Sequence, residues 1–208
     1  MLTELLHQRR SQRSYLPEKP PLTWLKEIVR CGRTAPSPGN SQPVRVRWID
    51  SESSRSRLQE ALARRRETFL QKHAEKKGSK RIRNYIRVYY RYSEFMFTAP
   101  WLLMVGTVPT SPGFADHMTA AGLCSRSPSK QTDKDITVGL FVSAMLLKAT
   151  ELGLDSCVLT APLVFLEEEN TLPTFAHFTP KCFVTLGYGA KTPPKTSRLE
   201  LASILERV

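Results

Sequence analysis

The apolar run from Trp101 to Val108, WLLMVGTV, constrains the fold more than any other part of the chain. It contains no charged residue and follows Pro100, which ends the preceding helical pattern. A short, continuous apolar run is typical of a strand buried on both faces, because a half-exposed strand alternates apolar and polar residues. We therefore expect a layered domain built around one sheet.

Further strands and several helices are predicted on either side of this run. Residues 44–49 alternate valine and arginine, which predicts a half-exposed strand, and residues 156–160 and 181–187 predict further buried strands. Helices are predicted near the N-terminus, from Leu22, over 51–77, over 80–97 and over 135–152, with a long loop at 109–132. The pattern indicates an α+β fold around one sheet of about four or five strands, without an internal repeat or a domain linker.

Length and composition restrict the class of protein. The 208 residues fit a single domain, 1–208, and contents of 40% hydrophobic and 24% charged residues are ordinary for a globular fold. No run of about 18 apolar residues occurs, so no membrane span is expected. The first residues lack the basic start and apolar core of a signal peptide.

The cysteines and histidines give no sign of a disulfide framework or a metal centre. The four cysteines form no C-x-x-C pair, and Cys31, Cys157 and Cys182 have apolar neighbours, as buried free thiols do. The four histidines are scattered, without the spacing of metal ligands. We therefore expect a reduced, cytoplasmic protein without a metal site.

Positive charge is concentrated in one segment. The formal net charge is +12, and the stretch from Arg55 to Arg91 holds 13 Lys and Arg residues against three Glu, a net charge of +10. Its cations and tyrosines could bind nucleic acid, but no DNA- or RNA-reading motif is present. We favour a solvated helix pair that forms an electropositive rim for anionic NAD(P)H or an acidic substrate. The tyrosines concerned are Tyr85, Tyr89, Tyr90 and Tyr92.

Two motifs near the N-terminus carry candidate binding groups. Residues 9–15 read RRSQRSY, and their guanidinium groups suit bidentate binding of phosphate oxygens. The alternative is a solvated helix end, because basic residues favour helix C-termini. Residues 36–42 read PSPGNSQ and predict a turn that could offer backbone and side-chain amides to a planar ligand, or could simply join a helix to a strand.

These motifs resemble those of the nitroreductase family of FMN flavoproteins, which have the forms RRSxRxY and APSxxNxQP. Residues 135–159, DITVGLFVSAMLLKATELGLDSCVL, resemble the family's long central helix and the strand beside the flavin. The sequence FVTLGYG at 183–189, followed by Lys195 and Arg198, resembles its last core strand and C-terminal basic residue. The four matches occur in family order over residues 9–198, whereas residues 51–134 match poorly.

The resemblance implies a three-layer fold, with a central, mostly antiparallel sheet flanked by helices, in a homodimer with two flavins at its interface. The basic helical segment 51–98 and the loop 109–132 would be its variable parts. The FMN phosphate and ribityl chain would meet Arg9, Arg10, Ser11 and Arg13, with Arg198 or Lys195 closing on the phosphate. The flavin ring would lie beside Val158, Leu159 and Thr160, and against Pro38, Asn40 and Gln42 of the other subunit. The chain departs from the family at Pro162, which lacks a donor N–H where many members have glycine nearby.

The implied activity is that of an FMN-dependent oxidoreductase that passes electrons from NAD(P)H to a small electron-poor acceptor, such as a nitroaromatic or a quinone, by a ping-pong mechanism. No catalytic side chain is expected, because the cofactor carries the chemistry. One alternative is a specialised flavin enzyme of the same fold, biosynthetic or dehalogenating. The other is a nucleic-acid-binding protein that uses residues 55–91.

Overall fold

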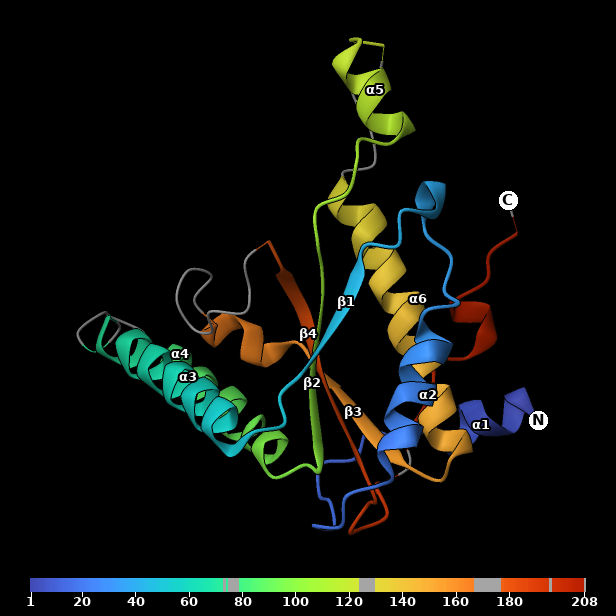
Figure 1. Cartoon of the computed structure of the whole chain (residues 1–208). Coiled ribbons are helices and arrows are strands. Elements are labelled where there is room, and N and C mark those ends of the chain that lie inside the picture. Colours follow the sequence, from blue (N-terminus) through green and yellow to red (C-terminus); the bar gives the residue numbers. More distant parts are fainter. Residues whose placement is uncertain (73, 75–78, 124–129, 167–176, 195, 208) are drawn as a thin grey trace.

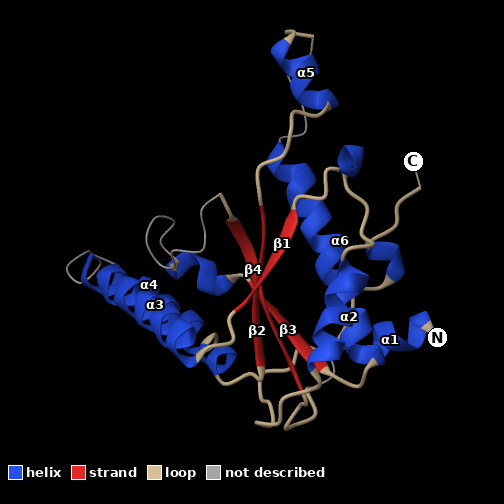
Figure 2. Cartoon of the chain, viewed as in Figure 1, coloured by secondary structure: helices blue, strands red, loops and turns tan. Residues whose placement is uncertain are grey.

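Four antiparallel strands form the central sheet of the computed structural model, which describes residues 1–72, 74, 79–123, 130–166, 177–194 and 196–207 (Figures 1 and 2). The strands are β1 (Val44–Trp48), β2 (Trp101–Thr107), β3 (Asp155–Leu159) and β4 (Thr179–Gly187). Their spatial order is β1-β2-β4-β3, so β1 and β3 are the edge strands. β2 is buried along its whole length, as its apolar sequence predicted.

Helices α2 (Leu22–Gly32) and α6 (Lys130–Glu151) cover one face of the sheet (Figure 1). Trp101, Leu103 and Val105 of β2 point to this face, because side chains alternate along a strand. They share one buried cluster with Ile28 of α2 and Met145 of α6, both fully buried. The short helix α1 (Leu2–Gln8) also contacts α6.

Helices α3 (Glu52–Lys72) and α4 (Ser79–Arg91) and the 3₁₀ helix η3 (Ala161–Phe165) cover the opposite face. Leu102 and Met104 of β2 point this way and share a second buried cluster with Leu58 of α3 and Phe165 of η3. The helices on both faces complete three layers, so the predicted α+β fold with a central antiparallel sheet is confirmed.

The buried side chain of Arg55 ties α3 to the sheet. Its guanidinium group donates to the carbonyls of Ile49 at 3.2 Å, Phe97 at 3.0 Å, Ala99 at 2.7 Å and Pro100 at 3.0 Å. Burial lowers the pKa of Arg55, and the four carbonyl acceptors compensate the buried charge. Arg55 is therefore a structural cation and does not belong to the exposed charge of the basic segment.

Two predictions of secondary structure were wrong in part. The predicted helix over 80–97 ends at Arg91, and the separate 3₁₀ helix η2 (Glu94–Phe97) follows it. The predicted loop over 109–132 contains α5 (Phe114–Ala120), and α6 already begins at Lys130. Asp116 explains α5, because its Oδ2 accepts the Gly113 N–H at 2.7 Å and caps the helix start.

Helix α5 stands away from the sheet, beyond the N-terminal end of α6 (Figure 1). The remaining described elements are the 3₁₀ helices η1 (Pro38–Asn40) and η5 (Leu201–Ser203). Gly78, predicted to break the basic helix, lies outside the described residues. Within the described residues no helix has both the length and the apolar character needed to cross a membrane.

Candidate functional site

The N-terminal segment from Arg9 to Tyr15 runs along the outer edge of β3. The backbone N–H of Gln12 donates to the carbonyl of Ser156 at 2.9 Å, and Ser11 forms a parallel bridge with Ser156. The RRSQRSY motif, which composition alone would place in solvent, is thus fixed against the sheet.

Tyr15 ties the far end of this segment to β4. Its hydroxyl donates to the carbonyl of Gln12 at 3.0 Å and lies 2.8 Å from Oγ1 of Thr185, and its backbone bridges Gly189. Burial raises the pKa of Tyr15 well above its usual range, so the hydroxyl remains a donor at neutral pH.

Gln12 anchors the middle of the segment from inside the protein. Its side chain is only 3% exposed, and its Nε2 donates to the carbonyl of Lys191 at 2.5 Å. Its Oε1 accepts the backbone N–H groups of Arg13 at 3.0 Å and Ser14 at 3.1 Å. Because side chains alternate along an extended segment, burying Gln12 turns Ser11 and Arg13 toward the opposite side.

Ser11, Arg13 and Arg9 gather around Cys157 of β3. Burial raises the pKa of the Cys157 thiol, while Arg13, a hydrogen bond from Ser11, and Arg9 act in the opposite direction. Two arginines and a hydroxyl that act on one buried atom create a local surplus of positive charge and donors, which suits an anionic ligand.

Beyond Ser156, the outer edge of β3 is open. The Ser156 carbonyl faces outward to Gln12, away from β4, and backbone groups two residues apart on a strand point the same way. The N–H and carbonyl of Val158 therefore also point outward, where the described residues provide no backbone partner; the carbonyl accepts only a weak hydrogen bond from Sγ of Cys157 at 3.7 Å. An N–H and a carbonyl side by side can pair with the polar edge of a planar ring.

Two hollows meet at this open edge. One, of about 650 Å³, lies between β3 and α6, and Arg9, Val158 and Thr160 line it together with the apolar side chains Val138, Val142 and Leu146 of α6. The other, of about 420 Å³, lies on the α4 side, where Arg13, Leu159 and Thr160 face Tyr89 and Tyr92. The first is large enough for a cofactor of drug-like size.

The turn with Pro38, Asn40 and Gln42 has an unusual backbone. Gly39, Asn40 and Gln42 have φ values of 57°, 51° and 42°, in the left-handed region that favours glycine. Nε2 of Gln42 donates to Oδ1 of Asn40 at 3.2 Å, and both side chains are exposed. Non-glycine residues in this region cost free energy, and such costs concentrate at binding sites.

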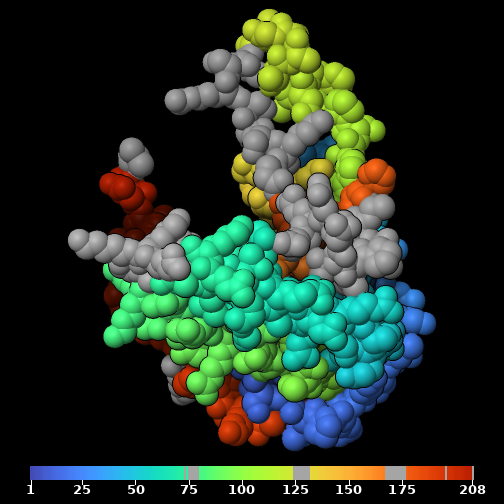
Figure 3. Space-filling view, turned by 90° about the vertical axis from the view of Figure 1, so that its left-hand side faces the viewer, coloured from blue at the N-terminus to red at the C-terminus, as the bar shows by residue number. Residues whose placement is uncertain are grey.

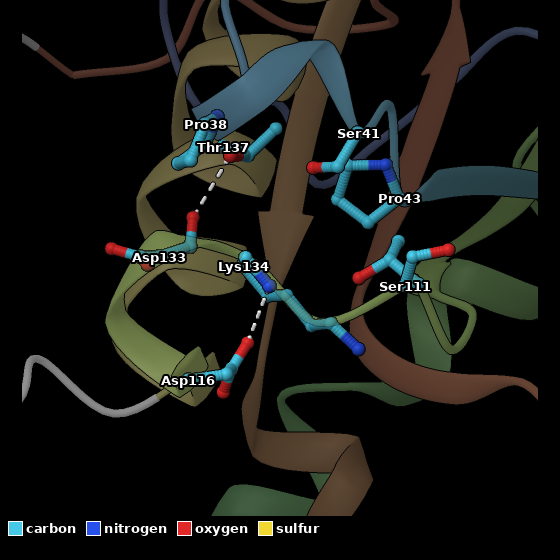
Figure 4. A pocket seen from close by; sticks show the side chains of 10 residues that line it. Pro38, Ser41, Pro43, Ser111, Asp116, Asp133, Lys134 and Thr137 are labelled. Atoms are coloured by element: carbon cyan, nitrogen blue, oxygen red, sulfur yellow. Dashed lines mark hydrogen bonds between the residues drawn. The ribbon is translucent and has the colours of Figure 1, made fainter. Parts of the chain in front are cut away.

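This turn lies far from the N-terminal segment within one chain. It precedes β1, and two strands separate β1 from β3. Pro38 borders a small hollow between the turn, the start of α5 and the start of α6, where Asp133, Lys134 and Thr137 lie (Figure 4). That hollow measures about 60 Å³, room for about two water molecules, so it cannot hold a flavin ring.

The structure does not direct the side chains of Arg10 and Arg198, two further predicted residues, toward the edge of β3. Arg10 turns back, and its Nη1 donates to the carbonyl of Arg9 at 2.9 Å. Arg198 is exposed and bonds Oγ1 of Thr196 at 2.7 Å, with no hydrogen bond or ion pair to the N-terminal segment in the described part of the chain. Lys195 lies outside the described residues.

Several residues of the site were missed from the sequence. Gln12 and Tyr15 lie inside the RRSQRSY motif, but their partners, the Lys191 carbonyl and Thr185, are distant in the chain, so no local pattern indicated these contacts. Gly189 is needed because a Cβ there would meet both Asp155 Oδ2 and Gln12 Nε2. Tyr89, on α4, reaches the edge of β3 only through the packing of α4 on the sheet, which no local pattern indicates.

These features define a three-layer α+β protein with a cationic site at an open sheet edge. The profile of the nitroreductase family matches residues 6–188, and the chain belongs to this family. The predicted resemblance is thereby confirmed.

One relative and two solved structures are similar to this chain. It is 28% identical to the iodotyrosine deiodinase of Thermotoga neapolitana over 97% of this chain and 95% of that protein. A BluB-like flavoprotein from Clostridium difficile 630 has a similar structure, with a TM-score of 0.79 at 16% identity and coverage of 100% and 99%. A structure of iodotyrosine deiodinase bound to FMN and 3-iodo-L-tyrosine has a TM-score of 0.66 at 23% identity, covering 97% and 96%.

Proposed function

We propose that this protein binds FMN along the outer edge of β3 and is an FMN-dependent oxidoreductase that passes electrons from NAD(P)H to a small electron-poor acceptor. The observation that carries the proposal is the clamped segment Ser11–Arg13, which lies beside the outward backbone groups of Val158. Membership of the nitroreductase family supports the same assignment.

The residues at this edge fit the two ends of FMN. Arg9 and Ser11 offer charge-assisted and hydroxyl hydrogen bonds to a phosphate, and Arg9, not Arg10, lines the larger hollow. The outward N–H and carbonyl of Val158 suit the polar edge of the isoalloxazine ring, while the apolar side chains of α6 suit its flat surface. Pro162 has no backbone N–H to offer a flavin ring. This has little effect on the proposed site, because the outward N–H there belongs to Val158.

The site is proposed to be completed by a second subunit. Pro38, Asn40 and Gln42 do not reach the edge of β3 in their own chain, yet their turn has a costly left-handed backbone. In a homodimer this turn would contact the flavin of the other subunit, and Arg198 in the exposed C-terminal segment would close on a phosphate.

Each residue has a positioning or electrostatic role in the proposed reaction. When bound, FMN would supply the redox chemistry between NAD(P)H and the acceptor, and the residues described above would hold and orient it. Arg13, between Gln12 and the open edge, adds positive charge that favours a reduced, more negative cofactor. The α4 side and the partner's surface would exclude water from the ring.

A dehalogenating enzyme of the same fold is the second candidate. The iodotyrosine deiodinase of Thermotoga neapolitana matches 97% of this chain at 28% identity, which favours a halogenated phenol among the acceptors to be tested. Both candidates need FMN at the same place and differ only in the acceptor.

Anaerobic half-reactions test the proposal and separate the candidates. FMN-loaded protein should lose its flavin absorbance on addition of NADH or NADPH and regain it with one acceptor class. Reoxidation by a nitroaromatic or a quinone, but not by an iodophenol, supports the general reductase, and the reverse supports the dehalogenase. A loaded flavin that neither coenzyme reduces would refute the NAD(P)H half of the proposal.

A further inference from the structure

Helix α4 exposes a row of apolar and aromatic side chains on one side. Ile82, Tyr85 and Tyr89 of α4, and Tyr92 in the turn directly after it, follow one another at spacings of three and four residues. The Tyr92 N–H still donates to the Val88 carbonyl at 2.9 Å, so all four share one side, and Val88 lies beside them. Their exposures are 45%, 49%, 53%, 66% and, for Val88, 43%, whereas Tyr90 on the inward side is 5% exposed. We call these five residues the tyrosine stripe.

Helix α4 also carries a row of positive charge. α4 carries five cations and no acidic residue, and none of the five forms a salt bridge within the described residues. Arg81 lies within the stripe, over the ring of Tyr85. Lys80, Arg87 and Arg91 are exposed and lie at spacings of seven and four residues, so they share the other flank of the helix. Together α3 and α4 form the outer surface on this side of the molecule (Figure 3).

The tyrosine stripe leads to the proposed cofactor site. Tyr89 and Tyr92 line the hollow of about 420 Å³ whose other wall is Arg13 and residues 157–161, from β3 to the start of η3. A molecule resting on the stripe would therefore approach the outer edge of β3 from the α4 side. Exposed tyrosines and arginines are the side chains most enriched in protein interfaces.

From this continuity we propose that the α4 surface docks a small acidic electron-carrier protein that reduces the cofactor, as an alternative to NAD(P)H. The proposal rests on the proposed FMN site. In each encounter one electron leaves the reduced centre of the carrier, which is thereby oxidised. Two encounters, with two protons from water, reduce one FMN. The cations steer the acidic carrier, and the tyrosines supply a small apolar contact, as is usual for transient redox complexes.

The same surface suits a nucleic acid less well. Arg81 lies over the ring of Tyr85 at 5.5 Å, and the rings of Tyr85 and Tyr89 pack against each other at 6.3 Å. The stripe is therefore not an open row of rings on which successive bases could stack. A nucleic acid would also gain nothing from lying next to a flavin edge.

The test uses the FMN-loaded protein and a plant-type [2Fe–2S] ferredoxin as the acidic probe, with FMN content measured first. Calorimetry should show salt-sensitive binding that is on the order of 10-fold or more weaker in the Arg87→Glu/Arg91→Glu variant. The Lys26→Glu/Arg30→Glu variant has the same charge change at the same spacing on α2 and should bind like the parent protein. The rate of flavin reduction by reduced ferredoxin should fall with the affinity, whereas FMN uptake should not change.

Each other outcome overturns the proposal. Absent binding of ferredoxin to FMN-loaded protein, or an equal loss in both charge-reversed variants, would exclude an α4 docking surface. Tighter binding of a single-stranded oligonucleotide than of ferredoxin, lost in the α4 variant, would make the surface a nucleic-acid site. Failure to load FMN at all would instead refute the proposed function.

Discussion

The Gln12→Ala substitution tests whether a buried amide positions the cofactor segment. It removes three hydrogen bonds, to Lys191, Arg13 and Ser14, each worth about 0.5–1.5 kcal/mol net. The free energy of unfolding should therefore fall by about 3 kcal/mol. For a chain of 208 residues this corresponds to a drop in Tm of roughly 6–12 °C.

Loss of Gln12 should also weaken FMN binding, although Gln12 itself is not proposed to contact FMN. Reordering one or two backbone residues costs about 1–2 kcal/mol each, so the Kd for FMN should rise roughly 10- to 100-fold. Gly189→Ala should act in the same direction, because the new Cβ would displace the Gln12 side chain. Calorimetry and flavin fluorescence quenching give the two values.

The control is Gln8→Ala, which removes one exposed hydrogen bond to Glu4 and should change neither quantity. A Gln12→Ala protein with a lower Tm but unchanged FMN affinity would show that Gln12 serves stability alone. Unchanged values of both would refute the described anchoring.

Three further outcomes are expected. Arg13→Ala removes the positive charge proposed beside the cofactor, and Arg198→Ala removes the proposed charge-assisted hydrogen bond to the phosphate. Each should weaken binding by about 1.5–3 kcal/mol and raise the Kd for FMN on the order of 10- to 100-fold, as measured by titration. Arg13→Ala chains mixed with Asn40→Ala/Gln42→Ala chains should regain tight FMN binding, because a mixed dimer holds one intact site; no recovery would contradict the shared site. Burial raises the pKa of Cys182 to about 12, so its contribution to stability is present below the thiol's ordinary pKa of about 8.5 and is lost as the pH rises toward 12; Cys182→Ala should remove that alkaline loss of unfolding free energy.

The fold could be predicted from the sequence where one local pattern decided the structure. The run from Trp101 to Val108 identified the buried strand β2, and helical spacing identified α6. The same reasoning missed α5, because the Pro, Gly and Ser residues around it suggested a loop. In α5 the capping hydrogen bond from the Gly113 N–H to Asp116 favours a helix more strongly than the loop-like composition disfavours it.

The site was predictable only as residue types. The motif RRSQRSY indicated a positively charged site for an anionic ligand. It did not indicate that Gln12 is the buried anchor, since glutamine is usually exposed. Its burial depends on the Lys191 carbonyl, 179 positions away in the chain. Likewise the sequence shows Tyr89 only as part of a basic segment. Its approach to the edge of β3 depends on how α4 packs on the sheet, which local sequence does not reveal.

The most direct test of the account is a titration of flavin-free protein with FMN, followed by chromatography of the bound cofactor. One FMN should bind per chain, and FAD should bind more weakly, because Arg9 and Ser11 provide for one phosphate group. Flavin fluorescence should be quenched in parallel, as expected for a ring held between β3 and a partner subunit. A protein that takes up neither FMN nor FAD would contradict the central claim that the edge of β3 is a flavin site.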